Sequence, residues 1–295
     1  MVAKPSVWWR AARPFTLSAS AVPVLVGSAL AFRDGQGSLP RLLLTLLGSL
    51  LVQAGVNFVD ESSDHGRVAS AHKHPAPYKV IARGELTAGA VRKGAFAVFG
   101  LAALVGIYFA AVVGLWILAV CLASLGAAYF YAGGRKPLGH AGLGWPLVFL
   151  FMGIVLTATS YAVHTLRLPP SALGLSLPVA CMVTAILVAN DLRDREEDLA
   201  EGKRTPVTAL GRGAGKAAWL VFVSAAYLLA VLWGELQGAR GSVLWVFLSV
   251  PWALRAGLRI VKGNERATLA PALPETGLLH LVFGILLAAG IFMGR

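Results

Sequence analysis

The chain has 295 residues, of which 57% are hydrophobic and only 14% are charged. Soluble domains usually carry about 25% charged residues, so the composition excludes an ordinary soluble protein and indicates an integral membrane protein. A net charge of +12 can indicate a nucleic-acid partner, but none is expected here. The basic residues stand in short loops between long apolar runs, where the positive-inside rule of membrane topology explains them. Cys121 and Cys181 both lie inside apolar runs and predict neither a disulfide framework nor a metal site.

Nine stretches are long and apolar enough to cross a membrane as helices, which takes about 17–25 residues. They cover residues 15–32, 41–59, 94–112, 114–131, 144–163, 172–190, 216–234, 242–258 and 276–293. The first lacks a convincing cleavage site, so we interpret it as a spanning helix and not as a signal peptide. Gly114 is the only turn signal near the middle of the long stretch 94–131, and eight spans with a re-entrant segment is the alternative count. We predict an all-α integral membrane protein with about nine transmembrane helices in one bundle.

The charge of the loops predicts the orientation of this bundle. With nine spans and a cytoplasmic N-terminus, only five of the 26 basic residues fall on the outer side: Arg33, Arg41, Arg167, Arg240 and Arg295. This asymmetry is what the positive-inside rule demands, and it supports an odd number of spans. We therefore expect the N-terminus to be cytoplasmic.

Acidic residues are scarce, and they are concentrated in two stretches. Nine of the 14 lie in or just after Asn57–Asp64 and Asn190–Asp198, each of which follows an apolar run. Asp191, Asp194 and Asp198 stand at i, i+3 and i+7, and Asn57, Asp60 and Asp64 repeat these offsets. On a helix such positions share one face, where like charges repel unless a cation lies between them. Magnesium suits this arrangement, because it takes one or two carboxylates together with water and substrate phosphate.

Both acidic stretches are expected at the cytoplasmic face, each followed by a basic loop, which suggests an internal duplication. Such a layout suits a substrate with a diphosphate head and an apolar tail. The bases nearby that can neutralise a diphosphate are Lys79, Arg83, Arg193, Lys203 and Arg204. Trp145 is interpreted first as an anchor at the membrane interface. His280, alone in the last span, is expected to be packed and hydrogen-bonded.

The residues resemble the UbiA superfamily of intramembrane prenyltransferases, which has two acidic motifs on two helices of a nine-helix bundle. Asn190-Asp191-x-x-Asp194-x-x-x-Asp198 matches the motif NDxxDxxxD in full and continues into Gly202-Lys203-Arg204-Thr205. Arg13-Pro14-Phe15-Thr16-Leu17 looks like the family's first helix, and Lys79 to Thr87 looks like the loop after the first motif. The run from Tyr131 through Gly144 looks most like the menaquinone branch, which prenylates dihydroxynaphthoate.

The resemblance implies one domain, residues 1–295, that transfers a polyprenyl group from its diphosphate to a small aromatic acceptor with Mg²⁺. It also implies an integral membrane protein, of the bacterial plasma membrane, whose active site faces the cytoplasm among membrane lipid. The catalytic acids would be Asp60, Asp64, Asp191, Asp194 and Asp198. The same five acids and Asn57 would bind the metal. The substrate-binding residues would be Asn57, Lys79, Arg83, Arg13, Asn190, Arg193, Lys203, Arg204 and Tyr131.

The first motif departs from the family pattern. With Asp60 and Asp64 in register, Asn57 occupies the position of the family's first Asp, which removes one negative charge that Glu61 can compensate. Two alternatives therefore stay open within the fold: cyclisation of a prenyl diphosphate, and transfer to a non-quinone acceptor. A membrane transporter is a further alternative, although transporter sites usually lie near the bilayer midplane. The acceptor, the chain length and the oligomeric state stay open.

Overall fold

The computed structural model describes residues 4–65 and 76–294, without the side chains of Asp64, His65 and Arg240. Every regular element in this part of the chain is helical. In the N-terminal half these are α1 (Pro5–Ala11), η1 (Pro14–Thr16), α2 (Ser18–Arg33), α3 (Leu39–His65), α4 (Ala88–Val113) and α5 (Trp116–Ala132). The middle holds η3 (Leu138–Ala141), α6 (Gly144–Leu147), the π-helical η4 (Val148–Val155), α7 (Leu156–Thr165) and α8 (Pro170–Ala200). The last part holds α9 (Pro206–Leu236), α10 (Arg240–Val243), η5 (Leu244–Ser249), α11 (Val250–Lys262), α12 (Arg266–Leu269) and α13 (Ala272–Met293).

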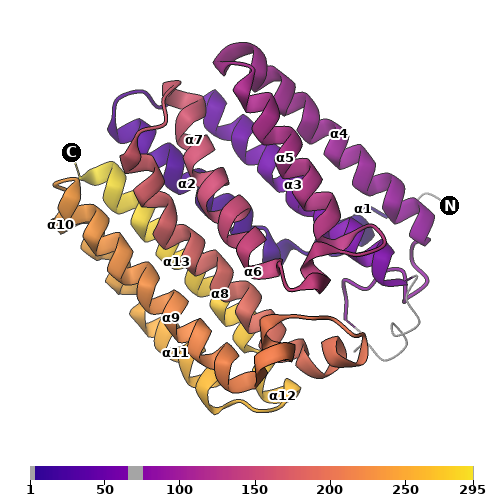
Figure 1. Cartoon of the computed structure of the whole chain (residues 1–295). Helices are drawn as coiled ribbons and strands as arrows, with labels where there is room; N and C mark the ends of the chain where they lie inside the picture. The colour runs from indigo at the N-terminus through magenta and orange to yellow at the C-terminus, as the bar shows by residue number, and fades with distance from the viewer. Residues whose placement is uncertain (1–3, 66–75, 295) are drawn as a thin grey trace.

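Eight helical stretches of the described residues are long and apolar enough to cross a membrane. The ninth expected span is α5, an apolar helix of 17 residues, at the lower limit of about 17–25. Gly114, at the junction of α4 and α5, has a φ of +135°, which only glycine adopts readily, so the long apolar stretch breaks there into two helices. Figure 1 shows α4 and α5 as separate helices lying side by side. The prediction of an all-helical membrane protein is confirmed.

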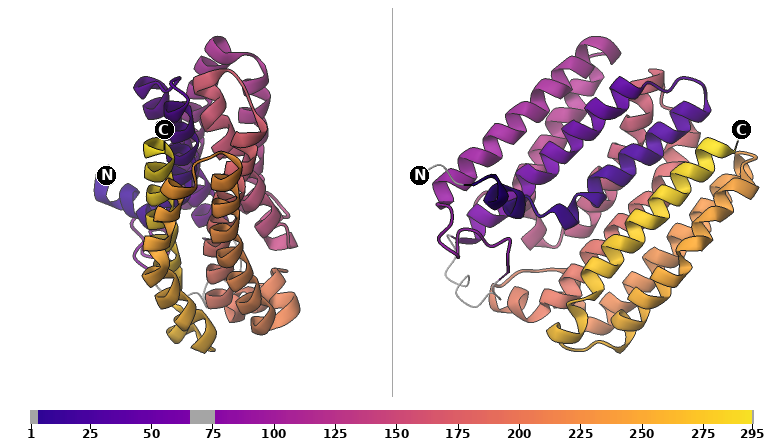
Figure 2. Two further views of the ribbon diagram at one scale, coloured as in Figure 1. Left: turned by 90° about the vertical axis from the view of Figure 1, so that its left-hand side faces the viewer. Right: turned by 180° about the vertical axis from the view of Figure 1, so that it is seen from behind.

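The helices form two packed groups. One apolar core joins α1, α3, α4 and α5, and a larger one joins α8 with α2, α9 and α13. The first group, with α1, α3, α4 and α5, lies at one side of the bundle, and α9, α11 and α13 lie at the other (Figures 1 and 2). Between them lie α6, α7 and also α2, which packs in the larger core. Since each core is built mainly from its own helices, the space between the two groups is where a cavity can form.

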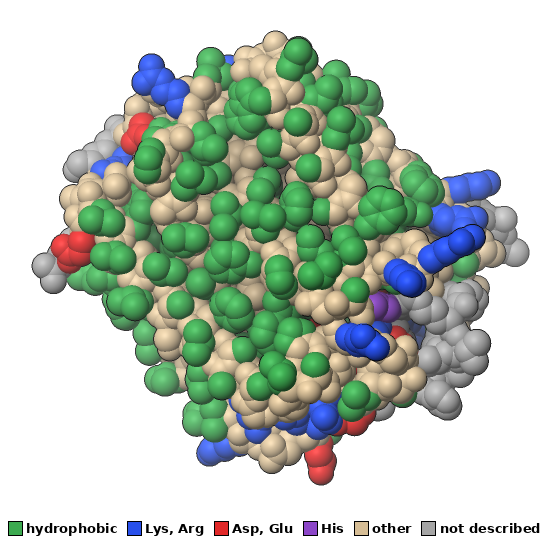
Figure 3. All heavy atoms as spheres, in the orientation of Figure 1, with side chains coloured by type: hydrophobic (Ala, Val, Ile, Leu, Met, Phe, Trp, Pro, Cys, Tyr) green, Lys and Arg blue, Asp and Glu red, His purple; other side chains and the backbone are tan. Residues whose placement is uncertain are grey.

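Large apolar side chains cover the outside of both groups, as a lipid-facing surface requires. Leu101, Leu104, Leu228, Leu232 and Leu254 are all at least half exposed. In Figure 3 hydrophobic side chains spread over most of one face, while Lys and Arg lie near its edges, most of them at the lower and right-hand ones. The chain is therefore an integral membrane protein, with an apolar surface of the kind that faces lipid.

The wall of the central space is shaped by a close contact between η4 and α8. A Cβ on Gly153 would lie 2.2 Å from the Cβ of Ala180, so only glycine permits this approach. With Gly153 turned to α8, the opposite face of η4 turns to the space between the two helix groups. A π-helix is uncommon and is found frequently at functional sites.

His280 corrects one expectation. It is fully buried in α13, as a packed residue should be, but neither ring nitrogen has a hydrogen-bond partner among the described residues. The prediction that it is hydrogen-bonded is wrong.

Candidate active site

A cavity of about 460 Å³ lies between the two helix groups. One end is polar and is lined by the acidic stretches of α3 and α8, with bases from the loops around them. The other end is apolar and extends between α3, α4, α5, η4 and α7. It reaches Phe109, Ile117 and Val163, three buried residues that pack together at this end. The cavity therefore combines an ionic entrance with an apolar interior.

The α8 stretch supplies most of the polar wall. Asn190, Asp191, Asp194 and Asp198 all line the cavity, as expected for residues on one helical face. The helix continues to Ala200, ten residues beyond the predicted end of the span. These carboxylates would repel one another without compensation, so their partners decide how the helix can extend here.

Asp194 is neutralised by two arginines. Arg193 donates from Nε to Oδ1 at 2.7 Å, and its Nη2 donates to Oδ2 and also to Asn190 at 2.9 Å. Arg266, on α12, donates to the same carboxylate and lies 3.1 Å from Glu197. Both arginines line the cavity. Two guanidinium groups thus lie where a phosphate could replace a carboxylate as their partner.

Asp198 is paired through the turn that follows α8. Lys203 Nζ lies 3.0 Å from Asp198 Oδ1 and 3.2 Å from Glu201 Oε2. The turn is held by Thr205, which caps α9 by accepting from the Thr208 N–H at 3.1 Å, with Thr208 donating to the Lys203 carbonyl. The helix cap of α9 thereby fixes the lysine beside the motif.

Asp191 has a different partner. The indole Nε1 of Trp145 donates to Asp191 Oδ2 at 2.8 Å. Trp145 packs against the larger core, with its ring 6.1 Å from that of Phe222. The polar tip of Trp145 therefore points into the protein, while its expected place at the membrane interface stays a prediction.

The α3 stretch forms the facing wall around Arg13. This residue has a φ of +53° at the start of η1, an uncommon conformation that directs its side chain toward α3. Its Nη2 lies 2.7 Å from Asp60 Oδ2, and its guanidinium lies 4.7 Å from the centre of the Tyr78 ring. Burial lowers the pKa of Arg13, but the negative charges of Asp60 and Glu61 outweigh burial and raise it above the ordinary value. Arg13 is thus a fixed positive charge.

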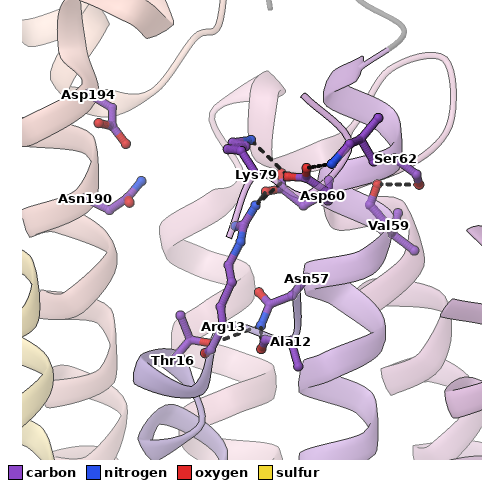
Figure 4. A network of polar contacts seen from close by, with 12 residues as sticks. Ala12, Arg13, Thr16, Asn57, Val59, Asp60, Ser62, Lys79, Asn190 and Asp194 are labelled. Carbon is purple, nitrogen blue, oxygen red and sulfur yellow. Dashed lines mark hydrogen bonds and ion pairs between the residues drawn. The ribbon is translucent and has the colours of Figure 1, made fainter. Parts of the chain in front are cut away.

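Glu61 is buried behind this wall and organises the next loop. It accepts from the Ile81 N–H at 3.2 Å and lies 3.5 Å from Lys79 Nζ. Figure 4 shows Lys79, Asp60 and Arg13 on one side of the site, with Asn190 and Asp194 of α8 facing them across the gap. The two acidic stretches, far apart in sequence, therefore face each other.

Asn57 is used as a donor. Its Nδ2 donates to the Ala12 carbonyl at 2.7 Å and to Thr16 Oγ1 at 2.9 Å, and Figure 4 shows the amide nitrogen directed to these atoms. The residue is buried and lines the cavity. An aspartate here could not donate either bond, so the departure from the family pattern has a structural reason in this chain.

The comparisons with known proteins agree with this geometry. Residues 20–292 match the model of the UbiA prenyltransferase family. The chain belongs to the UbiA prenyltransferase family. Its similarity to a 1,4-dihydroxy-2-naphthoate octaprenyltransferase of Bacillus subtilis is 29% identity, covering 97% of this chain and 92% of that one. A Mycobacterium tuberculosis protein of the same name is 28% identical, covering 98% and 97%. The expectation that the chain is an enzyme, a prenyltransferase of the UbiA superfamily, is confirmed.

Solved structures of UbiA proteins share the fold. A UbiA homolog from Archaeoglobus fulgidus bound to GPP and Mg²⁺ has a TM-score of 0.67 at 13% identity, covering 96% of this chain and 99% of that one. A UbiA homolog from Aeropyrum pernix K1 has a TM-score of 0.63 at 18% identity, covering 93% and 96%. At these identities the likeness extends to the fold alone.

Most of the site residues that the UbiA resemblance predicts line the cavity, and a few do not. The polar end of the cavity brings together most of them: Arg13, Asn57, Asp60, Lys79, Tyr131, Asn190, Asp191, Arg193, Asp194, Asp198 and Lys203. Arg83 and Arg204 are exposed and do not line the cavity, and Arg83 hydrogen-bonds Glu85 at 2.6 Å. The side chain of Asp64 lies outside the described residues. The roles of all these residues stay predictions.

Several residues of the site were not predicted, among them Tyr78, Trp145, Glu197 and Arg266. Glu197 lay inside the acidic stretch, but its offset excluded it from the common face. Arg266 comes from a loop whose bases were explained by topology alone. Only the tertiary structure brings these residues to the cavity.

The donors present fit a divalent cation that arrives with a substrate. As the described side chains stand, no three His, Cys, Asp or Glu residues are grouped closely enough to hold a metal ion by themselves. Magnesium usually takes only one or two carboxylates and completes its shell with water and substrate phosphate. Asp60 on one wall and Asp191, Asp194 and Asp198 on the other supply hard oxygen donors of this kind.

Proposed function

We propose that this chain, as a single domain over residues 1–295, transfers a polyprenyl group from its diphosphate to a dihydroxynaphthoate-like acceptor in quinone biosynthesis. The observation that carries the proposal is a single cavity that joins an ionic entrance to an apolar interior. An amphiphilic substrate with an anionic head and an isoprenoid tail matches both parts. The reaction takes place in the bacterial plasma membrane, with the entrance facing the cytoplasm, as the loop charges predict.

The charges of the cavity predict a requirement for metal. Among the described residues, five acids and five basic side chains line it: Asp60, Asp191, Asp194, Glu197 and Asp198, with Arg13, Lys79, Arg193, Lys203 and Arg266. These acids and bases are equal in number, so a diphosphate entering alone would add several uncompensated negative charges. Divalent cations bound by the acids would release the bases for the phosphate oxygens. Bound Mg²⁺ would act as a Lewis acid that stabilises the leaving diphosphate.

The apolar interior fits the prenyl chain. On α3 the lining residues run from Thr45 to Asp60, which at 1.5 Å per residue is about 22 Å of helix. This is most of the thickness of a bilayer core of about 30 Å. Phe109, Ile117 and Val163 pack together at the far end. The prenyl chain would therefore extend away from the entrance, alongside α3 and α5.

The reaction requires the protein to stabilise charges that separate as the prenyl diphosphate ionises. The allylic C–O bond breaks, and its electron pair leaves with the diphosphate. An electron-rich ring carbon of the acceptor then supplies the pair for the new C–C bond, and the group displaced from that carbon leaves without its bonding pair. Arg13, Arg193 and Arg266 would hold the diphosphate through charge-assisted hydrogen bonds. Tyr131, which lines the same end, is the candidate for contact with the ring.

The names of the relatives support the acceptor. The proteins from Bacillus subtilis and Mycobacterium tuberculosis are both named for 1,4-dihydroxy-2-naphthoate. A Synechocystis relative, 24% identical over 96% of this chain and 92% of that one, is a 2-carboxy-1,4-naphthoquinone phytyltransferase. A naphthalene ring carrying a carboxyl group is the chemistry these names share.

The test uses purified protein in lipid with Mg²⁺, labelled prenyl diphosphates of several lengths, and dihydroxynaphthoate or no acceptor. We expect acceptor-dependent release of diphosphate and a prenylated naphthalene product, both lost on chelation by EDTA. A cyclic hydrocarbon or alcohol in the acceptor-free arm would instead identify a cyclase. Release of no diphosphate in any arm would overturn the proposal in favour of a transporter.

A further inference from the structure

Asp191 differs from the other two acids of its motif. Asp194 is paired with Arg193 and Arg266, and Asp198 with Lys203 at 3.0 Å. Among the described residues, Asp191 forms no ion pair within 4.0 Å, and its one hydrogen bond comes from the neutral indole of Trp145. That bond is 2.8 Å long. A buried carboxylate without a cation is costly, so this position lacks a positive charge that a ligand can bring.

The geometry of this bond leaves one oxygen for a ligand. The indole engages Oδ2, whereas Oδ1 accepts no hydrogen bond from the described residues. Asp191 is only 5% exposed and lines the cavity, so the surface that Asp191 retains belongs to the cavity. A carboxylate held through one oxygen cannot rotate freely, and the other oxygen then has a defined position.

The donor itself is held by two helices. Trp145 follows Gly144 on α6, where a Cβ would lie 3.3 Å from Leu187, one turn before Asp191 on α8. The Trp145 ring meets Phe222 of α9 edge to face, at an interplanar angle of 81°. Since α8 and α9 fix both partners, the bond is a built feature of the core and does not depend on a mobile side chain.

We propose that Trp145 is a positioning residue: its indole N–H holds Asp191 Oδ2 so that Oδ1 is presented to the divalent cation that accompanies the diphosphate. This rests on the proposed function for the identity of the ligand. Supporting shells of this kind orient metal ligands in other proteins, and their loss typically costs 10–100-fold in metal affinity. A membrane anchor would instead direct the indole N–H to the headgroups.

The test compares two tryptophan variants that each lose one indole hydrogen bond. Trp145→Phe removes the donor to Asp191 and keeps an aromatic ring against Phe222. Trp233→Phe is the matched control, since Trp233 Nε1 donates to the Ser171 carbonyl at the same 2.8 Å, away from the cavity. Binding of geranyl diphosphate is measured by calorimetry while Mg²⁺ is titrated. We expect the Mg²⁺ concentration for half-maximal binding to rise about tenfold in Trp145→Phe and to be unchanged in Trp233→Phe.

A double-mutant cycle assigns the effect to Asp191. If Trp145 acts through this carboxylate, Trp145→Phe has no further effect on binding in an Asp191→Asn background and its full effect in an Asp194→Asn background. Trp145→His, which keeps a ring N–H, is expected to recover part of the Mg²⁺ affinity. If Trp145→Phe does not fold, Trp145→His is compared with the wild type in its place. Equal Mg²⁺ dependence in Trp145→Phe and wild type, or an undiminished effect without Asp191, would overturn the proposal.

These readouts separate the inference from the proposed function. Binding of geranyl diphosphate and Mg²⁺ needs no acceptor and no turnover. If the protein forms no prenylated naphthalene, the proposed acceptor is wrong. If Mg²⁺ affinity nevertheless falls only in Trp145→Phe, the positioning role of Trp145 is still supported.

Discussion

Arg266 in α12 donates a hydrogen bond to Asp194 in α8, which lies 72 residues earlier in the chain. The same guanidinium lies 3.1 Å from Glu197. The arginine therefore contacts two acids of the cavity wall. A metal ion taken up by these acids would free it to bind phosphate oxygens.

We predict that Arg266→Gln raises KM for the prenyl diphosphate about tenfold or more and leaves KM for the acceptor unchanged. A hydrogen bond to a charged group contributes about 1.5–3 kcal/mol, and a tenfold change corresponds to about 1.4 kcal/mol. Initial rates measured against each substrate in turn would show the difference.

Arg255→Gln is the matched control. Arg255 also pairs with an acid, Glu275 at 2.9 Å, but it is largely exposed and does not line the cavity. Exposed ion pairs contribute about 0–1 kcal/mol, so neither KM should change. If both variants weaken diphosphate binding equally, Arg266 contributes only to the general positive charge of this face.

The Arg266 contact also marks the limit of sequence-based prediction. The spacing of Asp191, Asp194 and Asp198 predicts a shared helical face, and all three do line one cavity. The predicted membrane span ended at residue 190, although the shared face already required helix as far as Asp198. The helix continues to Ala200 because cations from α8 itself, the following turn and α12 neutralise these acids. Contacts across such separations leave no periodic signal in the sequence.

Removing the charge of Asp194 tests the acidic stretch itself. Asp194→Asn should lower kcat at least about 100-fold, because the variant loses a proposed metal ligand and leaves two arginines without their carboxylate. Glu196→Gln is the control on the same helix, since Glu196 is 57% exposed at its side chain and pairs with Arg212 outside the cavity. Magnesium-dependent turnover and thermal unfolding are measured for both. Wild-type turnover in a folded Asp194→Asn protein would disprove an active site formed by the facing acidic stretches of α3 and α8.

Two roles for Asn57, metal ligand and hydrogen-bond donor, predict opposite effects of the variant Asn57→Asp. If Asn57 were a weakened metal ligand, Asn57→Asp would restore the family's acid and improve Mg²⁺ binding. The two donor bonds to Ala12 and Thr16 predict the reverse. A carboxylate would face two oxygens without a proton, and unmade buried hydrogen bonds cost about 1–3 kcal/mol each. We expect lower thermal stability and lower activity, measured in detergent against Ser62→Ala.

Ser62→Ala is a suitable control because Ser62 lies on the same helix and, within the part of the chain that the structure describes, its hydroxyl donates to the nearby Val59 carbonyl, at 3.1 Å. Its stability should match that of the wild type. The sequence identifies Asn57 as a departure from the family motif. It does not predict that the chain between α1 and α2 turns beside Asn57 and accepts its hydrogen bonds. The backbone at Ala12 and Arg13, which sets this contact, depends on a positive φ that no pattern in the chain predicts.

The length of the apolar interior should set the length of the prenyl chain. Ser124 lies on α5 among the lining residues, between Tyr131 near the entrance and Ile117 at the far end. Ser124→Trp would therefore block the cavity midway. We expect KM for geranyl diphosphate to change less than threefold, while KM for long-chain diphosphates rises at least about tenfold, since the distal part of the chain loses its apolar contacts. Leu122→Trp, on the same helix but 60% exposed on the lipid side, should alter neither value. An equal loss for short and long substrates in Ser124→Trp would show that the chain does not follow α5.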